Sequence, residues 1–177
     1  MIEEQEAELI SRCRQGDDKA FEKLVIKYQK PVYNLALRIT HSSMLAEEVT
    51  QVTFIKVFEK LDSYRCEYPF FSWLYRIAMN EAINEARRGK YHDKLENHYL
   101  AAETASSFEL ADAIQDALML LRPEDRALIV LRHFHHLGYP EIAYIINRSE
   151  SHVKSQLFRA RHALKQILIR MGISNEN

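Results

Sequence analysis

The stretch from Gly138 to Leu164 constrains the fold most strongly, because its pattern predicts two helices joined by a short turn. We expect the first helix over 141–146. Asn147 then stands in the turn, where Asn tolerates a left-handed backbone better than most residues. Ser149 is a good cap for the second helix. That helix has one apolar stripe at spacings of four, three and four residues, formed by Val153, Leu157, Ala160 and Leu164. The pattern therefore predicts a helix-turn-helix.

The face opposite this stripe indicates what the second helix binds. From Arg148 to Arg170 the chain has six Lys or Arg residues and one acid, Glu150. A basic helix that follows a tight turn is suited to the major groove of DNA. The alternative is a solvated charged helix packed on a shorter one. The expected DNA-binding residues of this helix are Ser151, His152, Lys154, Ser155, Arg159, Arg161 and Lys165.

Positions along the helix predict separate roles for these residues. His152 and Ser155 belong to the N-terminal turns, which enter the groove most deeply in this motif, so we expect them to read bases. Arg159 suits either a guanine edge or a phosphate. Three cations lie off that face and are expected to hold phosphates: Lys154, Arg161 and Lys165.

Composition places the protein in the all-helical class. Gly and Pro number four each in 177 residues, and apolar positions repeat at helical spacing along most of the chain. The formal net charge is −1. A near-neutral total argues against a purely electrostatic nucleic-acid coat, but it leaves room for a local basic surface.

No segment predicts export or membrane insertion. The first residues are acidic, so they match neither a secretory signal nor a transit peptide. No apolar run approaches the length of a membrane span. Cys13 and Cys66 lie far apart, match no metal spacing and are expected to be reduced thiols. We therefore expect a cytoplasmic protein with no direct membrane insertion.

The hydrophobic spacing predicts helices in the N-terminal part of the chain over 6–15, 19–40, 44–61 and 70–88. Pro31 lies inside the second of these and predicts a kink or break near Lys30. Between Gly89 and Ser107 the hydrophobic period fades, which predicts a linker. Beyond it, Pro123 suits the first position of another helix, and residues 133–138 are expected to form a loop. We expect an all-α fold of two small helical domains, residues 1–88 and 108–177, joined by a flexible linker over 89–107.

Three stretches, in this order, carry a resemblance to a known family: 46–61, 71–80 with its extension to Arg88, and 121–164. Together they resemble the extracytoplasmic-function (group IV) class of bacterial sigma-70 factors over nearly the whole chain. The resemblance implies that the first stretch docks on core RNA polymerase. It implies that the second melts and reads the −10 element of a promoter, and that the third reads the −35 element.

The same resemblance implies a specificity subunit with no enzymatic activity and no cofactor. Its implied partners are core RNA polymerase, promoter DNA and an anti-sigma factor. The sequence departs from the family pattern at Val52, where an acid is usual, and at Asn147, where Gly is usual. It departs again at Ser151 and His152, which replace a Gly-Thr pair and suggest a different −35 sequence. The expected polymerase-binding residues are Glu47, Glu48, Gln51 and Lys56.

Opening a duplex requires side chains that trap unstacked bases, and aromatic faces and amide edges are suited to that. The loop over 62–68 is the expected base-capturing pocket. Trp73 has an alternative role as a core anchor, and Asn80 an alternative role in a buried hydrogen bond between helices. The expected −10 and melting residues are Tyr64, Tyr68, Trp73, Arg76, Asn80, Asn84, Arg87 and Arg88.

Two other functions compete with this one. A stand-alone helix-turn-helix regulator would bind duplex DNA without polymerase, whereas a sigma factor with two tethered domains should bind promoters poorly when free. A metal-dependent enzyme would use His133, His135 and His136, but no carboxylate or Cys completes a ligand spacing beside them. No paired carboxylates stand beside a base, nucleophile or Gly-rich loop, so we expect no catalytic site and no metal.

Overall fold

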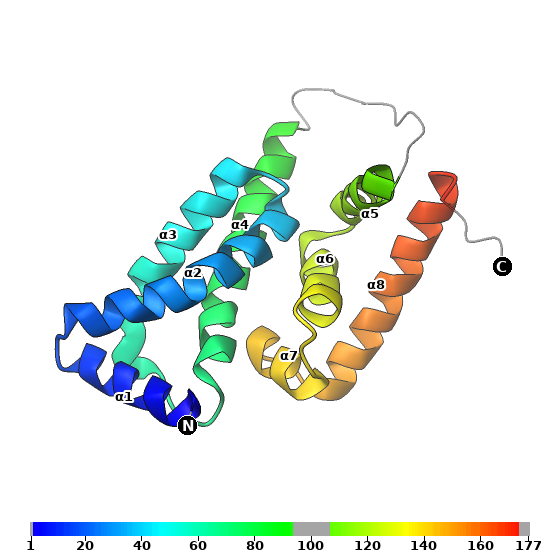
Figure 1. The fold of residues 1–177 in the computed structure, drawn as a ribbon. Coiled ribbons are helices and arrows are strands. Elements are labelled where there is room, and N and C mark those ends of the chain that lie inside the picture. The colour runs from blue at the N-terminus through cyan, green and yellow to red at the C-terminus, as the bar shows by residue number, and fades with distance from the viewer. Residues whose placement is uncertain (1, 94–106, 174–177) are drawn as a thin grey trace.

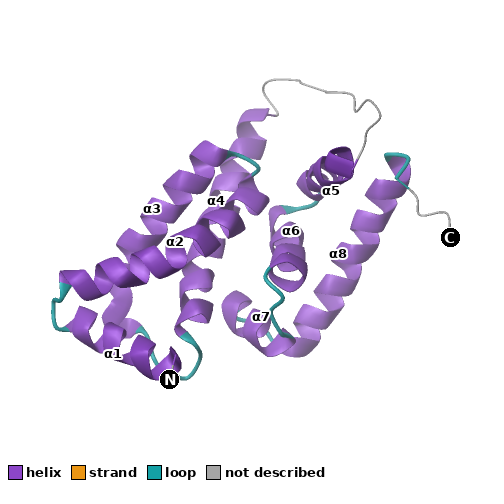
Figure 2. Cartoon of the chain, viewed as in Figure 1, coloured by secondary structure: helices purple, strands orange, loops and turns teal. Residues whose placement is uncertain are grey.

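The computed structural model describes residues 2–93 and 107–173, which form helices and short connections (Figure 1). Figure 2 shows no strand in the part of the chain that is described. The predicted all-α class with two helical domains is confirmed. The core of the predicted linker, 94–106, lies outside the described residues.

The N-terminal domain consists of α1 (Ile2–Arg14), α2 (Asp18–Thr40), α3 (Ser43–Lys60), the 3₁₀ turn η1 (Leu61–Ser63) and α4 (Phe70–Asp93). Local signals explain the helix starts. Asp17 caps α2 by accepting from the backbone N–H groups of Lys19 and Ala20, and Ser42 caps α3 by accepting from that of Leu45. Both caps satisfy donors that would otherwise lack partners at a helix start.

The structure differs from the expectations for this domain at two points, and of the kink or break expected near Lys30 it excludes the break. Helix α2 runs without a break through Pro31. Proline costs a helix interior about 3 kcal/mol, but Tyr28 and Val32 are buried on either side of it, so core packing holds the helix together. Helix α4 continues past Arg88 to Asp93, although Gly89 was expected to open the linker.

The C-terminal domain consists of α5 (Ser107–Leu120), α6 (Pro123–Ile129), the π-helical turn η2 (Val130–Phe134), α7 (Tyr139–Ile146) and α8 (Glu150–Arg170). The predicted loop therefore begins after Phe134 rather than at His133. The predicted helix-turn-helix is confirmed in α7 and α8: Asn147 has φ 54° and ψ 52°, and the Ser149 side chain accepts from the backbone N–H of His152. Helix α7 starts before Glu141, whose carboxylate accepts from the Gly138 N–H at 2.6 Å.

The two domains also pack against each other, which the sequence did not predict. Helix α4 contacts α6 and α7, and the end of α2 contacts η2 (Figure 1). Tyr68 stacks on Tyr144 with ring centroids 4.0 Å apart. The Tyr75 hydroxyl lies 3.1 Å from Nδ1 of His135. The domains thus share an interface in addition to the covalent linker.

Arg126 lies at this interface and is fully buried, with 0% of its surface exposed. Its guanidinium donates to the backbone oxygen of Ile39 at the end of α2. It also donates to three backbone oxygens at the end of α5, those of Leu118, Met119 and Leu121. Carbonyl groups at helix ends lack partners within the helix and carry partial negative charge, so a single cation serves two helix ends.

Candidate nucleic-acid and polymerase interfaces

All seven expected DNA-binding residues of α8 are exposed (Ser151, His152, Lys154, Ser155, Arg159, Arg161 and Lys165). The apolar stripe below them is buried at Val153, Leu157 and Ala160, so α8 is held by one face and presents the other. Arg161 donates from Nε to Nε2 of His133 at 3.1 Å, which draws its side chain toward the η2 turn. This placement suits a flanking phosphate contact better than a base contact.

Phe158 on the outer side of α8 was missed in the sequence analysis. Its side chain is 73% exposed and lies next to Arg159 on α8. An exposed aromatic residue on a groove-binding helix can contact the methyl group of thymine. The signal was available in the sequence, because Phe158 falls outside the buried stripe.

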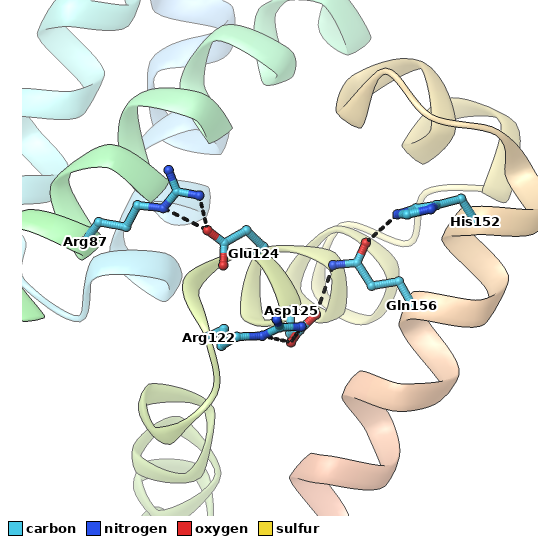
Figure 3. Close-up of polar contacts among 6 residues, drawn as sticks. All are labelled: Arg87, Arg122, Glu124, Asp125, His152 and Gln156. Atoms are coloured by element: carbon cyan, nitrogen blue, oxygen red, sulfur yellow. Dashed lines mark hydrogen bonds and ion pairs between the residues drawn. The ribbon is translucent and has the colours of Figure 1, made fainter.

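A chain of hydrogen bonds links His152 to helix α6 (Figure 3). Nε2 of His152 lies 3.2 Å from Oε1 of Gln156, and Nε2 of Gln156 donates to Oδ1 of Asp125 at 2.9 Å. Asp125 is buried and also accepts from Nε of Arg122 at 2.8 Å. The N-terminal part of α8 is therefore tied to the N-terminal turn of α6.

The polar face of α4 carries Asn80, Asn84, Arg87 and Arg88, and all four side chains are exposed. The exposure of Asn80 excludes its alternative role in a buried hydrogen bond. Arg87 donates from Nε to Glu124 of α6 at 2.8 Å (Figure 3). Arg88 pairs with Glu85 on the same helix at 2.6 Å. The face suits a polar ligand, but Arg87 is engaged by the other domain.

The aromatic residues near the start of α4 divide between core and surface. Tyr64 is buried, its hydroxyl donates to the backbone oxygen of Tyr68 at 2.8 Å, and burial raises its pKa to about 12. Trp73 is half-buried against Tyr64 and Phe70, which agrees with its alternative role as a core anchor. In this structure Tyr64 therefore supports the loop from inside, and its role at the −10 element stays a prediction.

Tyr68 is the aromatic residue of this loop with an exposed ring, at 38% of its surface. One face of the ring is covered by Tyr144 of α7. Arg76 is half-buried, and its guanidinium lies 5.9 Å from the centre of the same Tyr144 ring. Two of the expected −10 residues are thus in contact with the helix-turn-helix.

The two candidate DNA faces border one cleft between the domains, which we call the interdomain cleft. Its walls include Asn80, Asn84 and Arg87 from α4. The opposite wall includes His152 and Gln156 from α8. Residues expected to contact two separate promoter elements are therefore side by side in this arrangement.

Helix α3 presents the expected polymerase-binding residues unevenly. Glu47, Glu48 and Gln51 are exposed. Lys56 is half-buried and pairs with Glu81 of α4 at 2.6 Å, which gives it a role in packing α3 on α4. Gln51 also borders an apolar groove between α2 and α3, which we call the α2–α3 groove. The groove was not predicted from the sequence, and its apolar lining consists of Phe21, Val25, Phe54, Ile55 and Phe58.

Two of the three neighbouring histidines, His133 and His135, contact different partners. His133 accepts from Arg161, whereas His135 lies against Tyr75. Burial, assisted by the positive charge of Arg38, lowers the pKa of His135 to about 4, so the ring is neutral at pH 7. Among the described residues, no group of three or more His, Cys, Asp or Glu side chains is arranged to hold a metal ion.

None of the described helices combines the length and apolar character needed to cross a lipid bilayer.

Comparison with known families assigns both domains. Residues 24–92 match the family model Sigma-70 region 2, and residues 111–164 match the family model Sigma-70, region 4. The RNA polymerase sigma-H factor of Pseudomonas aeruginosa is 34% identical, over 95% of this chain and 96% of that protein. The ECF RNA polymerase sigma-E factor of Escherichia coli K12 is 37% identical, over 88% of this chain and 90% of that protein.

Solved structures share the fold. CnrH, in complex with the cytosolic domain of CnrY, superposes with a TM-score of 0.72 at 25% identity, over 94% of this chain and 98% of that chain. The sigma factor RpoE of Bartonella quintana, in complex with the anti-sigma factor NepR, gives a TM-score of 0.66 at 23% identity, over 85% of this chain and 97% of that chain. With both regions matched in order and relatives that span nearly the whole length, the chain belongs to the extracytoplasmic-function sigma factors of the sigma-70 family.

Proposed function

We propose that this chain directs core RNA polymerase to promoters by reading the −35 element with α8 and the −10 element with α4 and the loop before it. The observation that supports this most is the exposed basic face of α8 in a helix-turn-helix that follows a sigma region 2 domain. The stand-alone regulator is not favoured, because relatives matched over most of the chain are RNA polymerase sigma factors.

At the −35 element, His152 and Ser155 contact base edges and Lys154, Arg161 and Lys165 contact phosphates. At the −10 element, the exposed Tyr68 ring stacks on an unpaired base, and stacking of this kind contributes about 1–3 kcal/mol per base. Asn80 and Asn84 offer donors and acceptors one helical turn apart, and Arg88 holds the backbone. Arg76 and Arg87 contact the −10 DNA as well, once Arg76 has separated from Tyr144 and Arg87 from Glu124.

Core polymerase docks on α3 around Glu47, Glu48 and Gln51, and the α2–α3 groove receives an apolar segment of it. The groove offers aromatic and branched side chains beside charged ones, the usual make-up of a protein–protein contact. Lys56 contributes through its pair with Glu81 rather than by direct contact.

A second protein holds the sigma factor inactive. CnrH, at 25% identity, forms a complex with the cytosolic domain of CnrY, and we extend a protein partner of this anti-sigma kind to the present chain. The protein acts in the cytoplasm, where polymerase and promoters are, and it works without catalysis or a cofactor of its own.

The test is a selection of −35 sequences by holoenzyme from a randomised pool. His152→Ala and Ser155→Ala should each relax preference at one position and cost about 1–3 kcal/mol there. Lys154→Ala should weaken all sequences alike and reduce the salt dependence. If Lys154→Ala alters the selected sequence while the other two leave it intact, the helix is rotated from this placement and the assignments are wrong.

A further inference from the structure

We propose that Gln156 and Asp125 form a positioning relay for His152, so that the His152 ring meets the −35 element as a hydrogen-bond acceptor at Nδ1. The relay consists of the three residues linked in Figure 3, with distances of 3.2 Å from His152 to Gln156 and 2.9 Å from Gln156 to Asp125. This inference rests on the proposed role of α8 in reading the −35 element.

Asp125 is the fixed end of the relay. Its side chain lies in the N-terminal turn of α6, where a negative charge is favoured by the unpaired N–H groups of the helix. It is 8% exposed and is also held by Arg122. Since α6 belongs to the domain core, the carboxylate gives α8 a rigid reference point across the helix-turn-helix.

The chemistry of the carboxylate sets the orientation of Gln156. An ionised carboxylate only accepts hydrogen bonds, so the Gln156 amide must turn its NH₂ group toward Asp125. Its oxygen then faces His152. An amide oxygen only accepts, so Nε2 of His152 must carry the hydrogen. One buried charge thus determines both an amide orientation and an imidazole tautomer.

The tautomer of His152 determines how its other ring nitrogen, Nδ1, can contact a base. In the neutral ring, Nδ1 is then an acceptor, and within the described residues no side chain donates to it. The major-groove donors available to an acceptor are the amino groups of adenine and cytosine. The relay therefore predicts that His152 selects a base pair by one of these amino groups, and that it disfavours a carbonyl oxygen at the same place.

Gln156 could instead be a simple tie between α8 and α6, and the experiment separates these roles. Holoenzymes carrying Gln156→Leu, His152→Ala and the double variant select −35 sequences from a randomised pool. Gln166→Leu, an exposed position on the same helix, is the matched control. Thermal unfolding reports stability, and Asp125→Asn serves as a second variant, because an amide at 125 no longer forces the orientation of Gln156.

With the relay, Gln156→Leu and Asp125→Asn reduce preference at the same single position as His152→Ala, by about two- to tenfold, the scale of one neutral hydrogen bond. The double variant is then no worse than His152→Ala alone, since both changes remove one contact. The control leaves the selected sequence unchanged.

Three results would overturn the relay. If Gln156→Leu lowers binding at every sequence equally, the residue is a structural tie. If its effect adds to that of His152→Ala, Gln156 contacts DNA by itself. If His152→Ala relaxes one position and neither relay variant does, the ring needs no positioning, but the proposed function stands. Promoter-directed transcription by the unaltered protein is measured in a separate experiment. Only the absence of that transcription would contradict the proposed function.

Discussion

Arg126 is a buried cation that bonds backbone oxygens in both domains. Its buried guanidinium binds backbone oxygens at the ends of both α2 and α5. Burial lowers the pKa of Arg126 to about 10, so the group remains charged at neutral pH. A planar group with five donors can serve several carbonyls at once, which the three donors of a lysine on a single nitrogen cannot.

We therefore expect Arg126→Lys to destabilise the protein by about 1–3 kcal/mol, the cost of leaving buried carbonyl groups without a donor. Urea denaturation measures the free energy of unfolding. Arg122→Lys is the matched control, because the Arg122 side chain is 74% exposed and should change stability by no more than about 0.5 kcal/mol. Equal losses from both changes would contradict the role given to Arg126.

His135 predicts a pH dependence of stability. Its pKa lies at about 4 in the folded protein against 6.5 for an unperturbed histidine, so the folded state resists protonation. The charged and polar groups that face it are Arg38 from α2, Tyr75 from α4 and its neighbour His136. Stability should therefore be unaffected by this group above pH 6.5 and should fall as the pH drops from about 6.5 to about 4.

The measurement is the free energy of unfolding at pH 7 and at pH 4.5, for the unaltered protein and for His135→Phe. The loss on acidification should be smaller in the variant, because an apolar ring cannot be protonated. His162→Phe, at an exposed histidine of α8, should leave the loss unchanged. If all three proteins lose the same free energy of unfolding between pH 7 and pH 4.5, protonation of His135 does not contribute to the pH dependence of stability.

At the scale of elements, we expect the α2–α3 groove to contribute to the binding of core polymerase. Ile55 is 57% exposed beside this groove, and exposed apolar side chains grouped in a groove mark interaction sites. Ile26 on α2 is 61% exposed but does not line the groove, which makes it a natural control.

Ile55→Ser should weaken binding of core polymerase by about ten- to a hundredfold, because burying such a side chain contributes about 1.5–3 kcal/mol. Ile26→Ser should bind as the unaltered protein does. Titration of labelled protein with core polymerase gives both dissociation constants, and thermal unfolding should be the same for the two variants. If both substitutions weaken polymerase binding equally, the α2–α3 groove is not the docking surface.

The helices were the most predictable part of the fold, because their signals are local. The left-handed Asn147, the Ser149 cap and the stripe from Val153 to Ala160 all act within a few residues of one another, and the structure has each in its expected place. The unbroken helix through Pro31 was not predictable in this way, because it depends on core contacts made by other helices.

For the whole molecule, the contact between the domains is the feature that could not be predicted from the sequence. Tyr68, Arg76 and Arg87 carry the chemistry of a nucleic-acid site, but nothing in their spacing indicates that Tyr144 and Glu124 engage them first. Likewise, the burial of Tyr64 depends on Phe70 and Trp73 meeting it after the loop folds. These side-chain contacts depend on tertiary packing, and the spacing of hydrophobic residues along the sequence does not predict them.

The arrangement predicts that the domains separate when this contact is weakened. Glu124→Lys combined with Tyr144→Ala removes the pair with Arg87 and the stack on Tyr68, so small-angle scattering should show a larger radius of gyration. Adding Arg87→Glu restores an opposite charge and should recover part of the compaction, although one exposed pair contributes only about 0–1 kcal/mol. An unchanged radius in the double variant would mean that other contacts hold the domains.

If the two domains act together to direct polymerase, transcription in vitro should depend on this protein. Purified core polymerase is supplied with a library of genomic promoter fragments, with and without this protein, and the transcript starts are mapped. We expect new starts that require the protein and lie downstream of shared −35 and −10 sequences. If no new start appears, and the protein alone binds one duplex sequence tightly at physiological salt, it acts as a stand-alone regulator and not as a sigma factor.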